Sequence, residues 1–250
     1  MQRMGGYLLQ ILIIFALGAA SLKCCTLNDI HAIILARGGS KGIKSKNMLT
    51  FNGTTLLGQT IKTLAETNKF SAIWVSTDDK RIAQEAIKNG ALVYKRMSCF
   101  AEDHSSSLDA IKEFLYTHFF VNRFALFQCT SIFLKKEYIT EAVKKFQNSP
   151  CVFAVKRTHK LKWIEQNLSI KPLNFDPKRR PRRQDWRGEL EETGMFYFSN
   201  RLLVSKNLLQ SERCSVVEIE SIDSIEIDSP NDYEMAKCIL NIKKRINDRL

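Results

Sequence analysis

The sequence lacks several patterns that would assign it directly to a class of protein. Its seven cysteines are scattered, with no Cys-x-x-Cys pair and no zinc-ligand spacing, so they indicate neither a zinc module nor a defined disulfide framework. The GxxxxGK[ST] phosphate loop and the GxGxxG dinucleotide fingerprint do not occur. There is no internal repeat and no low-complexity linker. These absences argue against repeat architectures and against the commonest nucleotide-binding motifs.

Long hydrophobic runs are also missing, except for one near the start of the chain. Residues 5–22 carry no charged side chain, and an arginine precedes them while a lysine follows. A positive start, an apolar stretch and small residues near its end are typical of a secretory signal peptide or a short signal anchor, with a buried first strand or helix as the alternative. We expect residues 1–23 to be such a leader. Sequons at Asn52 and Asn167 fit a glycoprotein on the secretory route.

Negative charge is scarce relative to positive charge. The chain has 38 Lys and Arg against 26 Asp and Glu, which gives a formal net charge of +12. Such an excess suggests an anionic partner, for which nucleic acid, a phosphorylated metabolite and a membrane surface are candidates, while a well-hydrated basic surface is the alternative. The positions of the charges have to decide between them.

The chain does contain a regular alternation of short β-type runs and amphipathic helical segments. The expected strands are residues 31–35, 72–77, 91–94, 124–128 and 151–155, and the expected helices are 56–68, 81–89, 107–118 and 137–147. This rhythm with short loops predicts an α/β fold built on a mostly parallel, doubly wound sheet. Ligands of such sheets bind at the carboxyl ends of the strands. Polar residues follow three of these ends, at the loop after the first strand, at residues 76–78 and at Gln128.

The alternation stops between residues 156 and 195. This stretch is punctuated by prolines and contains the basic run KRRPRR at residues 178–183. We expect it to leave the sheet as an arm or a β-hairpin. The expected later elements are strands at 195–198 and 216–220 and a helix over 233–250. The prediction is therefore one domain over residues 28–240, with 156–195 as an inserted excursion and 241–250 as a basic helix end.

The loop after the first strand is rich in glycine and in cations. Residues 35–47 read LARGGSKGIKSKN. Glycine lets the backbone approach an anion closely, and Lys and Arg add charge-assisted hydrogen bonds. N–H groups at the start of a helix also favour negative charge. The loop is therefore predicted to bind phosphate groups, with a solvated basic turn as the alternative.

The same loop resembles the first signature of the CMP-N-acylneuraminate cytidylyltransferases, the CMP-sialic acid synthetases. Further stretches agree in order and spacing: WVSTDD at 74–79, SSSLDAI at 105–111, FQCTS at 127–131, KRRPRRQDW at 178–186 and GELEETGMFYF at 188–198. The last two are similar to the animal members of the family. The resemblance extends over residues 31–240, and the apolar leader is closest to the insect Golgi forms.

The resemblance implies a Rossmann-like nucleotidyltransferase with an inserted dimerisation arm. Such an enzyme transfers CMP from CTP to the anomeric 2-hydroxyl of N-acylneuraminate, releases pyrophosphate, is assisted by Mg²⁺ and works as a homodimer or homotetramer. The residues it implies for nucleotide and sugar binding are Arg37, Ser40, Lys41, Asn47, Arg96, Ser105, Ser107 and Gln128. The residues it implies for catalysis are Lys46, Arg182 and Arg183, the two arginines lying on an arm that reaches across a dimer.

The metal site departs from the family pattern. The family carries an Asp-x-Asp pair near the end of the core, because a hard divalent cation prefers carboxylate oxygens. Aligned on Pro230, this chain is one residue short, and Asp223 is the expected ligand. Glu226 and Asp228 would lie on the opposite face if the segment were a strand. We therefore hypothesise a weakened Mg²⁺ site built on Asp223.

Three alternatives to sialic acid activation remain open. The chain could act on another 2-keto sugar acid, or bind nucleotide without turnover because its metal site is altered. The KRRPRR run also resembles a nuclear localisation signal or a nucleic-acid patch, although no aromatic stacking array or recognised binding module surrounds it. For location the leader indicates the secretory pathway and the family resemblance the Golgi, with the nucleus as the alternative from that run.

Overall fold

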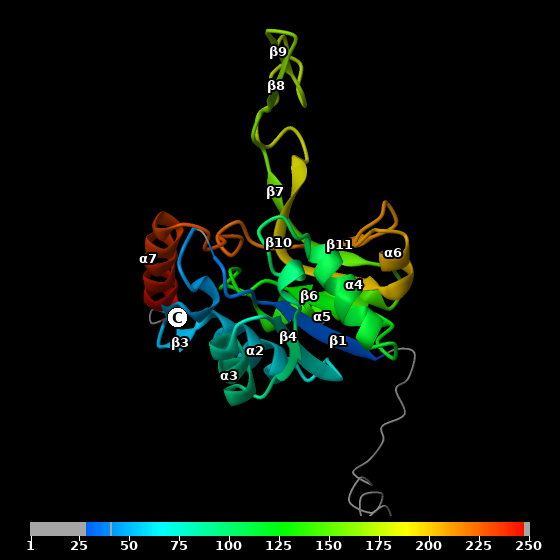
Figure 1. The fold of residues 1–250 in the computed structure, drawn as a ribbon. Coiled ribbons are helices and arrows are strands. Elements are labelled where there is room, and N and C mark those ends of the chain that lie inside the picture. The colour runs from blue at the N-terminus through cyan, green and yellow to red at the C-terminus, as the bar shows by residue number, and fades with distance from the viewer. Residues whose placement is uncertain (1–28, 41, 248–250) are drawn as a thin grey trace, which may run out of the picture.

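A seven-stranded mixed sheet forms the centre of the protein (Figure 1). The computed structural model describes residues 29–40 and 42–247, so the predicted leader and Lys41 lie outside the described residues. The sheet order is β11-β7-β10-β6-β1-β4-β5. Its strands are β1 (Ile30–Leu35), β4 (Ala72–Thr77), β5 (Leu92–Lys95), β6 (Arg123–Phe127), β7 (Val152–Thr158), β10 (Glu189–Asn200) and β11 (Ser215–Glu218). All of them run parallel except β10, which is antiparallel to both β6 and β7.

Helices cover both faces of this sheet. They are α2 (Leu56–Thr67), α3 (Lys80–Lys88), α4 (Ser107–Thr117), α5 (Lys136–Phe146), α6 (Arg201–Ser205) and α7 (Pro230–Asn247). Alternate residues of β1 show the two layers: Ala32 and Ile34 pack into the core under α2, α3, α5 and α7, whereas Ile33 packs against α4 and α6. Successive side chains of a strand point to opposite faces, so a run buried on both sides reads as continuously apolar. The predicted α/β, doubly wound, mostly parallel fold is confirmed.

The predicted elements before residue 156 occur with their ends shifted by only a few residues. Three later or smaller features were missed. These are the short helix α6, the antiparallel direction of β10 and a two-stranded turn of β2 (Thr50–Phe51) and β3 (Thr54–Thr55) around Asn52. The last helix begins at Pro230 instead of Tyr233, because proline lacks an N–H and suits the first position of a helix.

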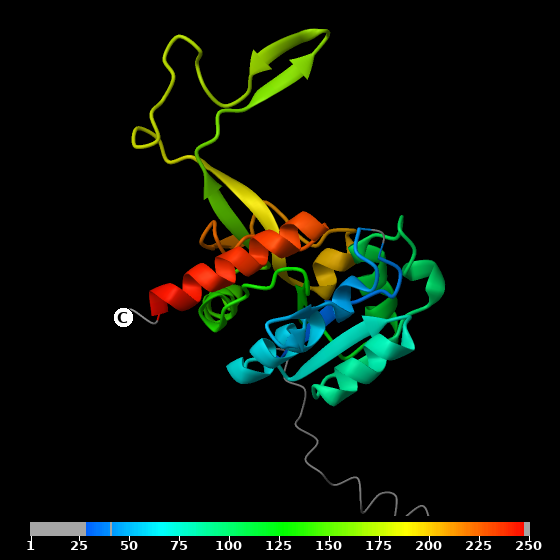
Figure 2. The ribbon, with the colours of Figure 1, turned by 90° about the vertical axis from the view of Figure 1, so that its left-hand side faces the viewer.

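The predicted excursion is a projecting arm. Strands β7 and β10 continue beyond the sheet, and between them a hairpin of β8 (Trp163–Gln166) and β9 (Ser169–Pro172) stands clear of the domain (Figure 2). The hairpin turn at Asn167 and Leu168 is exposed, and both residues have positive φ. The arm also exposes large apolar side chains: Trp163, Ile164, Leu168, Ile170 and Leu173. Such a surface on a projecting segment is typical of contact with a partner chain.

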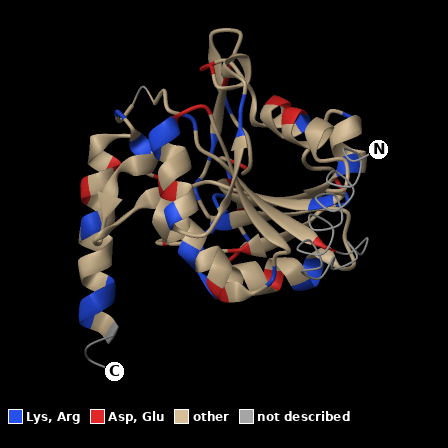
Figure 3. Ribbon diagram, turned by 60° about the horizontal axis from the view of Figure 1, so that its bottom comes forward, with Lys and Arg blue, Asp and Glu red and all other residues tan. Residues whose placement is uncertain are grey.

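A disulfide joins Cys151 to Cys214, next to the paired starts of β7 and β11. The scattered cysteine pattern could not assign this pair. Within residues 29–40 and 42–247, no helix combines the length and apolar character needed to cross a membrane. In the view of Figure 3, Lys and Arg are interspersed with Asp and Glu over the helices.

Candidate active site

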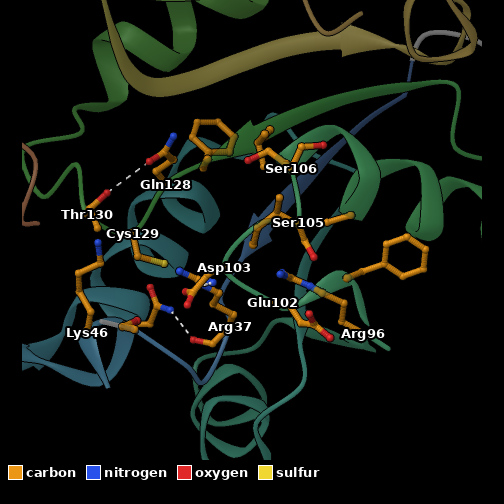
Figure 4. Close-up of a pocket in the computed structure, with 18 of the residues that line it drawn as sticks. Arg37, Lys46, Arg96, Glu102, Asp103, Ser105, Ser106, Gln128, Cys129 and Thr130 are labelled. Atoms are coloured by element: carbon orange, nitrogen blue, oxygen red, sulfur yellow. Dashed lines mark hydrogen bonds and ion pairs between the residues drawn. The ribbon is translucent and has the colours of Figure 1, made fainter. Parts of the chain in front are cut away.

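A cavity of about 480 Å³ opens at the carboxyl ends of β1 and β6 (Figure 4). The structure brings eight of the predicted site residues to its wall: Arg37, Ser40, Lys46, Asn47, Arg96, Ser105, Ser107 and Gln128. They come from four separate stretches of sequence, each following a strand or leading into α4. The position agrees with the rule that doubly wound sheets bind ligands at their carboxyl edge.

The glycine-rich loop is held in a fixed shape by two polar side chains. The buried Asn47 donates from Nδ2 to the carbonyl of Arg37 over 3.1 Å, which ties the end of the loop to its start. The N–H of Gly38 donates to Asp78 Oδ1 over 2.9 Å, which ties the loop to the segment after β4. A one-turn helix, η1 (Lys46–Met48), closes it. The loop is therefore pre-shaped to present its cations to the cavity.

Among the described residues of this loop, Arg37 and Lys46 line the cavity, and each pairs with an acid from another segment. Arg37 Nη1 lies 2.7 Å from Asp103 Oδ1, and Lys46 Nζ lies 2.7 Å from Asp228 Oδ1. Figure 4 shows Arg37 beside Asp103, and Lys46 extending toward Thr130. A polyphosphate carries more negative charge than one carboxylate, so it would compete for both cations. The arrangement fits a site for an anion of several phosphate units.

Arg96 supplies a third cation, which is buried and rigid. Its side chain is 5% exposed, and its Nε donates to Ser76 Oγ over 3.0 Å. Burial lowers the pKa of the Arg96 guanidinium, while the nearby carboxylates Asp78 and Glu113 raise it. An arginine remains protonated under any such shift in a protein. Arg96 is therefore a fixed positive charge between β5 and the start of α4.

Hydroxyl and amide groups line the remaining wall. Ser106 caps α4 by accepting from the N–H of Asp109, and it lines the cavity together with Ser105 and Ser107. Gln128 follows β6 and lies across the cavity from Ser105 and Ser106 (Figure 4). Neutral donors and acceptors of this kind recognise sugar and nucleoside hydroxyls. The cavity thus combines a cationic half with a neutral polar half.

The prediction that Asp223 is a metal ligand is wrong. Asp223 is fully buried, and its Oδ2 accepts from Lys135 Nζ and from the Tyr138 hydroxyl, each over 2.7 Å. Its Oδ1 is paired with Lys243. Burial raises the pKa of the Asp223 carboxyl, but the hydrogen bonds from these three side chains outweigh burial and lower it. Both oxygens are already engaged by cations or a hydroxyl, so no face is left for a metal ion.

Asp228 is the acid of this segment that lines the cavity, and Glu226 lies near it, within electrostatic range of Asp228 and Lys46. The expectation that Glu226 and Asp228 point away assumed a strand, whereas the segment between β11 and α7 is irregular. The N–H of the buried Ile227 donates to the carbonyl of Thr130 over 3.1 Å, and this bond lays the segment across the end of β6. Asp228 lines the cavity, and Glu226 Oε1 accepts from Ser131 Oγ over 3.1 Å. Burial, with help from the Asp228 charge, raises the pKa of Glu226.

These two carboxylates fit a site for Mg²⁺. Mg²⁺ in phosphate-transfer sites is usually held by one or two carboxylates together with substrate phosphates and water. Asp228 lies beside Lys46, where a bound polyphosphate would also lie. The signal available in the sequence was the acid-x-acid spacing of Glu226 and Asp228, which was set aside because the segment was read as a strand.

Arg182 and Arg183 do not line the cavity of their own chain. Both are exposed on the arm, and Arg182 Nε pairs with Asp185 Oδ2 over 2.8 Å. Their predicted role across a dimer therefore stays a prediction. Sequence reasoning also missed Asp103, Ser106 and Thr130, which line the cavity. Ser106 and Thr130 lie within the stretches at 105–111 and 127–131 that carry the family resemblance, whereas Asp103 lies outside them.

Comparison with known proteins gives a consistent result. A family model described as cytidylyltransferase matches residues 31–240. The chain is 42% identical over 214 residues to N-acylneuraminate cytidylyltransferase A of Danio rerio, a match that covers 83% of this chain and 50% of that protein. It is 31% identical over 228 residues to N-acylneuraminate cytidylyltransferase of Escherichia coli O18:K1:H7, with 86% and 53% covered. The chain spans about half the length of the curated relatives it matches.

Solved structures share the fold at low sequence identity. CMP:2-keto-3-deoxy-manno-octonic acid synthetase complexed with CTP superposes with a TM-score of 0.65 at 16% identity, covering 86% of this chain and 99% of that one. 4-Diphosphocytidyl-2C-methyl-D-erythritol synthase of Anaerococcus prevotii gives 0.64 at 15% identity, covering 86% and 100%. These likenesses support the Rossmann-like arrangement of the sheet and its helices.

Proposed function

Because this chain belongs to the cytidylyltransferase family, we propose that it transfers CMP from CTP to the anomeric 2-hydroxyl of an N-acylneuraminate. The two products are CMP-sialic acid and pyrophosphate. The observation that carries the proposal is the cavity, which joins three cations to a neutral polar wall. The 42% identity to a fish N-acylneuraminate cytidylyltransferase supports this choice of sugar acid.

The triphosphate of CTP would lie along the glycine-rich loop. Arg37, Ser40 and Lys46 are placed to bind its oxygens, and the acids now paired with the two cations would be displaced. The sugar hydroxyl oxygen forms a bond to the α-phosphorus, the bond from that phosphorus to the bridging oxygen breaks, and pyrophosphate leaves with the electron pair. The hydroxyl proton passes to solvent. Positioning and charge stabilisation supply most of the catalysis in such transfers.

Glu226 and Asp228 would hold the divalent cation, for which we propose Mg²⁺. A bound Mg²⁺ supplies neutralisation of the negative charge on the triphosphate and the leaving pyrophosphate. The carboxylates of this chain must be ionised to bind it. Because the pKa of Glu226 is raised, its ionised form is lost at a higher pH than for an exposed glutamate. We therefore expect the affinity for Mg²⁺ to fall when the pH drops below the pKa of Glu226.

The sugar acid would occupy the neutral half of the cavity. Gln128 and the serine hydroxyls at the start of α4 suit a polyol, while a sugar carboxylate also needs a cation. We propose that Arg182 and Arg183 supply that charge from the arm of a second protomer in a homodimer or homotetramer. The exposed apolar side chains of the arm support this pairing.

The proposal is tested by assaying the purified chain with CTP, Mg²⁺ and several sugar acids. Pyrophosphate release that requires N-acetylneuraminate supports it. Release that requires another 2-keto sugar acid instead would reassign the substrate. CTP binding without pyrophosphate release, whichever sugar acid is added, would indicate a nucleotide-binding protein without this activity. A steeply salt-dependent affinity for nucleic acid would instead indicate that the KRRPRR run is the functional feature.

Glycine at position 42 permits a close approach that no other residue allows. A Cβ at Gly42 would collide with the backbone carbonyl of Asp228, whereas a Cβ at Gly39 in the same loop would meet no atom within 4 Å. Gly42→Ala should therefore push the loop and Asp228 apart and lower kcat by about ten- to a hundredfold, as displacements of catalytic groups do. Steady-state pyrophosphate release measures this. Gly39→Ala is the matched control and should stay near wild type; equal losses in both variants would contradict the geometric explanation.

We also propose that the protein works in the secretory pathway, in the Golgi. The Cys151–Cys214 disulfide supports an oxidising compartment, and both sequons lie in exposed turns that a glycosyltransferase could reach. The full-length chain expressed in animal cells should shift to lower mass after glycosidase treatment, and Asn167→Gln or Asn52→Gln should remove part of the shift. Accumulation of an unglycosylated form in the nucleus would instead favour the KRRPRR run as the targeting signal.

A further inference from the structure

Asp223 is a fully buried carboxylate that lies outside the cavity. It sits in the irregular segment of residues 219–229, which connects β11 to α7 and contains no regular strand or helix. This segment also carries Glu226 and Asp228, three and five residues further on. A buried acid so close to two site acids raises the question of what it contributes to them.

Asp223 joins this segment to two helices. Lys135 and Tyr138 reach it from the N-cap and the first turn of α5, and Lys243 reaches it from the C-terminal part of α7. The Tyr138 hydroxyl also accepts from the N–H of Glu220 over 3.2 Å, so it contacts the segment at a second point. Lys243 lies over the ring of Phe133, 4.3 Å from its centre, and is thereby fixed as well.

The other end of the segment is fixed independently. Asp232 in the first turn of α7 accepts from the N–H groups of Asp228 and Ser229 over 3.1 and 2.7 Å. Between this cap and Asp223, Ile227 donates its N–H to Thr130 and buries its side chain. An irregular segment has many accessible backbone states, and each must be excluded by specific contacts. Residues 224–229 are therefore held in place at both ends, by Asp223 and Asp232, and in the middle by Ile227.

We propose that Asp223 is a positioning residue, whose contacts with Lys135, Tyr138 and Lys243 hold residues 224–229 so that Asp228 faces the cavity with Glu226 close to it. The effect of this positioning on catalysis rests on the function proposed above. Asp223 touches neither substrate nor metal in this role. It acts only through the two acids that follow it.

The test uses Asp223→Asn in the full chain, with three readouts. Backbone hydrogen exchange at Ile227 should accelerate relative to the amides of β1, because the ion pairs of residue 223 with Lys135 and Lys243 are weakened. The affinity for Mn²⁺ in the presence of CTP, measured by titration calorimetry, should fall by about tenfold or more, as losses of supporting contacts behind metal ligands do. In the pyrophosphate assay, kcat should fall and raised Mg²⁺ should recover part of it.

A matched control changes Lys136, the lysine that follows Lys135 at the start of α5. Lys136 pairs with Glu66 over 3.3 Å at the surface, away from the 219–229 segment, so Lys136→Met should leave all three readouts near wild type. Should Asp223→Asn fail to fold, Tyr138→Phe removes a single hydroxyl from the same cluster and should shift the readouts in the same direction by less.

The outcomes separate this proposal from the proposed function. A lower melting temperature for Asp223→Asn, with exchange at Ile227 and the Mn²⁺ affinity unchanged, would reduce Asp223 to a stabilising core contact and overturn the positioning role. Faster exchange and weaker Mn²⁺ binding in a protein whose wild type releases no pyrophosphate would sustain the positioning role while the proposed function fails.

Discussion

Lys46→Met is expected to lower kcat for pyrophosphate release by about a hundredfold to a thousandfold, the range found when one preorganised charge is removed from a transition state. Lys46 Nζ lines the cavity and lies 2.7 Å from Asp228, which places it between the triphosphate and the acids that would hold the metal. Its ammonium would stabilise the charge that develops on the transferring phosphate. Methionine keeps the length and apolar stem of the side chain and removes only the charge.

The control for this variant lies two residues away in the same loop. Lys44 is exposed and does not line the cavity, so Lys44→Met removes the same charge from the loop without touching the site. Steady-state kinetics at saturating CTP should show Lys44→Met within about twofold of wild type, as for surface charges in general. Equal activities for Lys46→Met and wild type would remove Lys46 from catalysis.

The second large effect concerns the arm. Arg182→Ala combined with Arg183→Ala should abolish most of the activity, although neither arginine approaches the cavity of its own chain. If the two arginines act in the cavity of a partner, a mixture with Lys46→Met should regain activity, because a heterodimer contains one site with both an intact loop and an intact arm. Random pairing in a two-fold dimer predicts recovery of about a quarter of wild-type activity.

Co-expression of the two variants followed by the pyrophosphate assay measures this recovery. Lys178→Ala, in the same basic run, is the control and should retain wild-type activity alone. A co-expressed mixture as inactive as its separate components, in a protein that is dimeric by light scattering, would show that the arm does not complete a partner's site. The two arginines would then have to be explained by stability or by binding to another molecule.

Local patterns explain why so much of the fold could be predicted. The strands and helices before residue 156 follow from apolar alternation and helical spacing, which are properties of adjacent residues. The loop at 35–47 could be placed at the carboxyl end of β1 because it follows that strand directly. Its cations and Gln128 then converge for topological reasons, since parallel strands end at the same edge of the sheet.

Tertiary contacts explain what was missed. Asp223 and Asp228 have the same side chain in the same short segment, and only the lysines of α5 and α7 decide which one is buried in ion pairs. Those lysines lie 88 residues before and 20 residues after Asp223 and follow no recognisable spacing. The Cys151–Cys214 pairing and the antiparallel direction of β10 likewise depend on how distant segments meet.

The most direct measurement is pyrophosphate release by the purified full-length chain from CTP, Mg²⁺ and N-acetylneuraminate, with the nucleotide product identified by mass. The proposed function predicts release that depends on all three components, yields CMP-N-acetylneuraminate and is lost in Lys46→Met. Release with no dependence on the sugar acid, or CTP binding with no release at all, would contradict it.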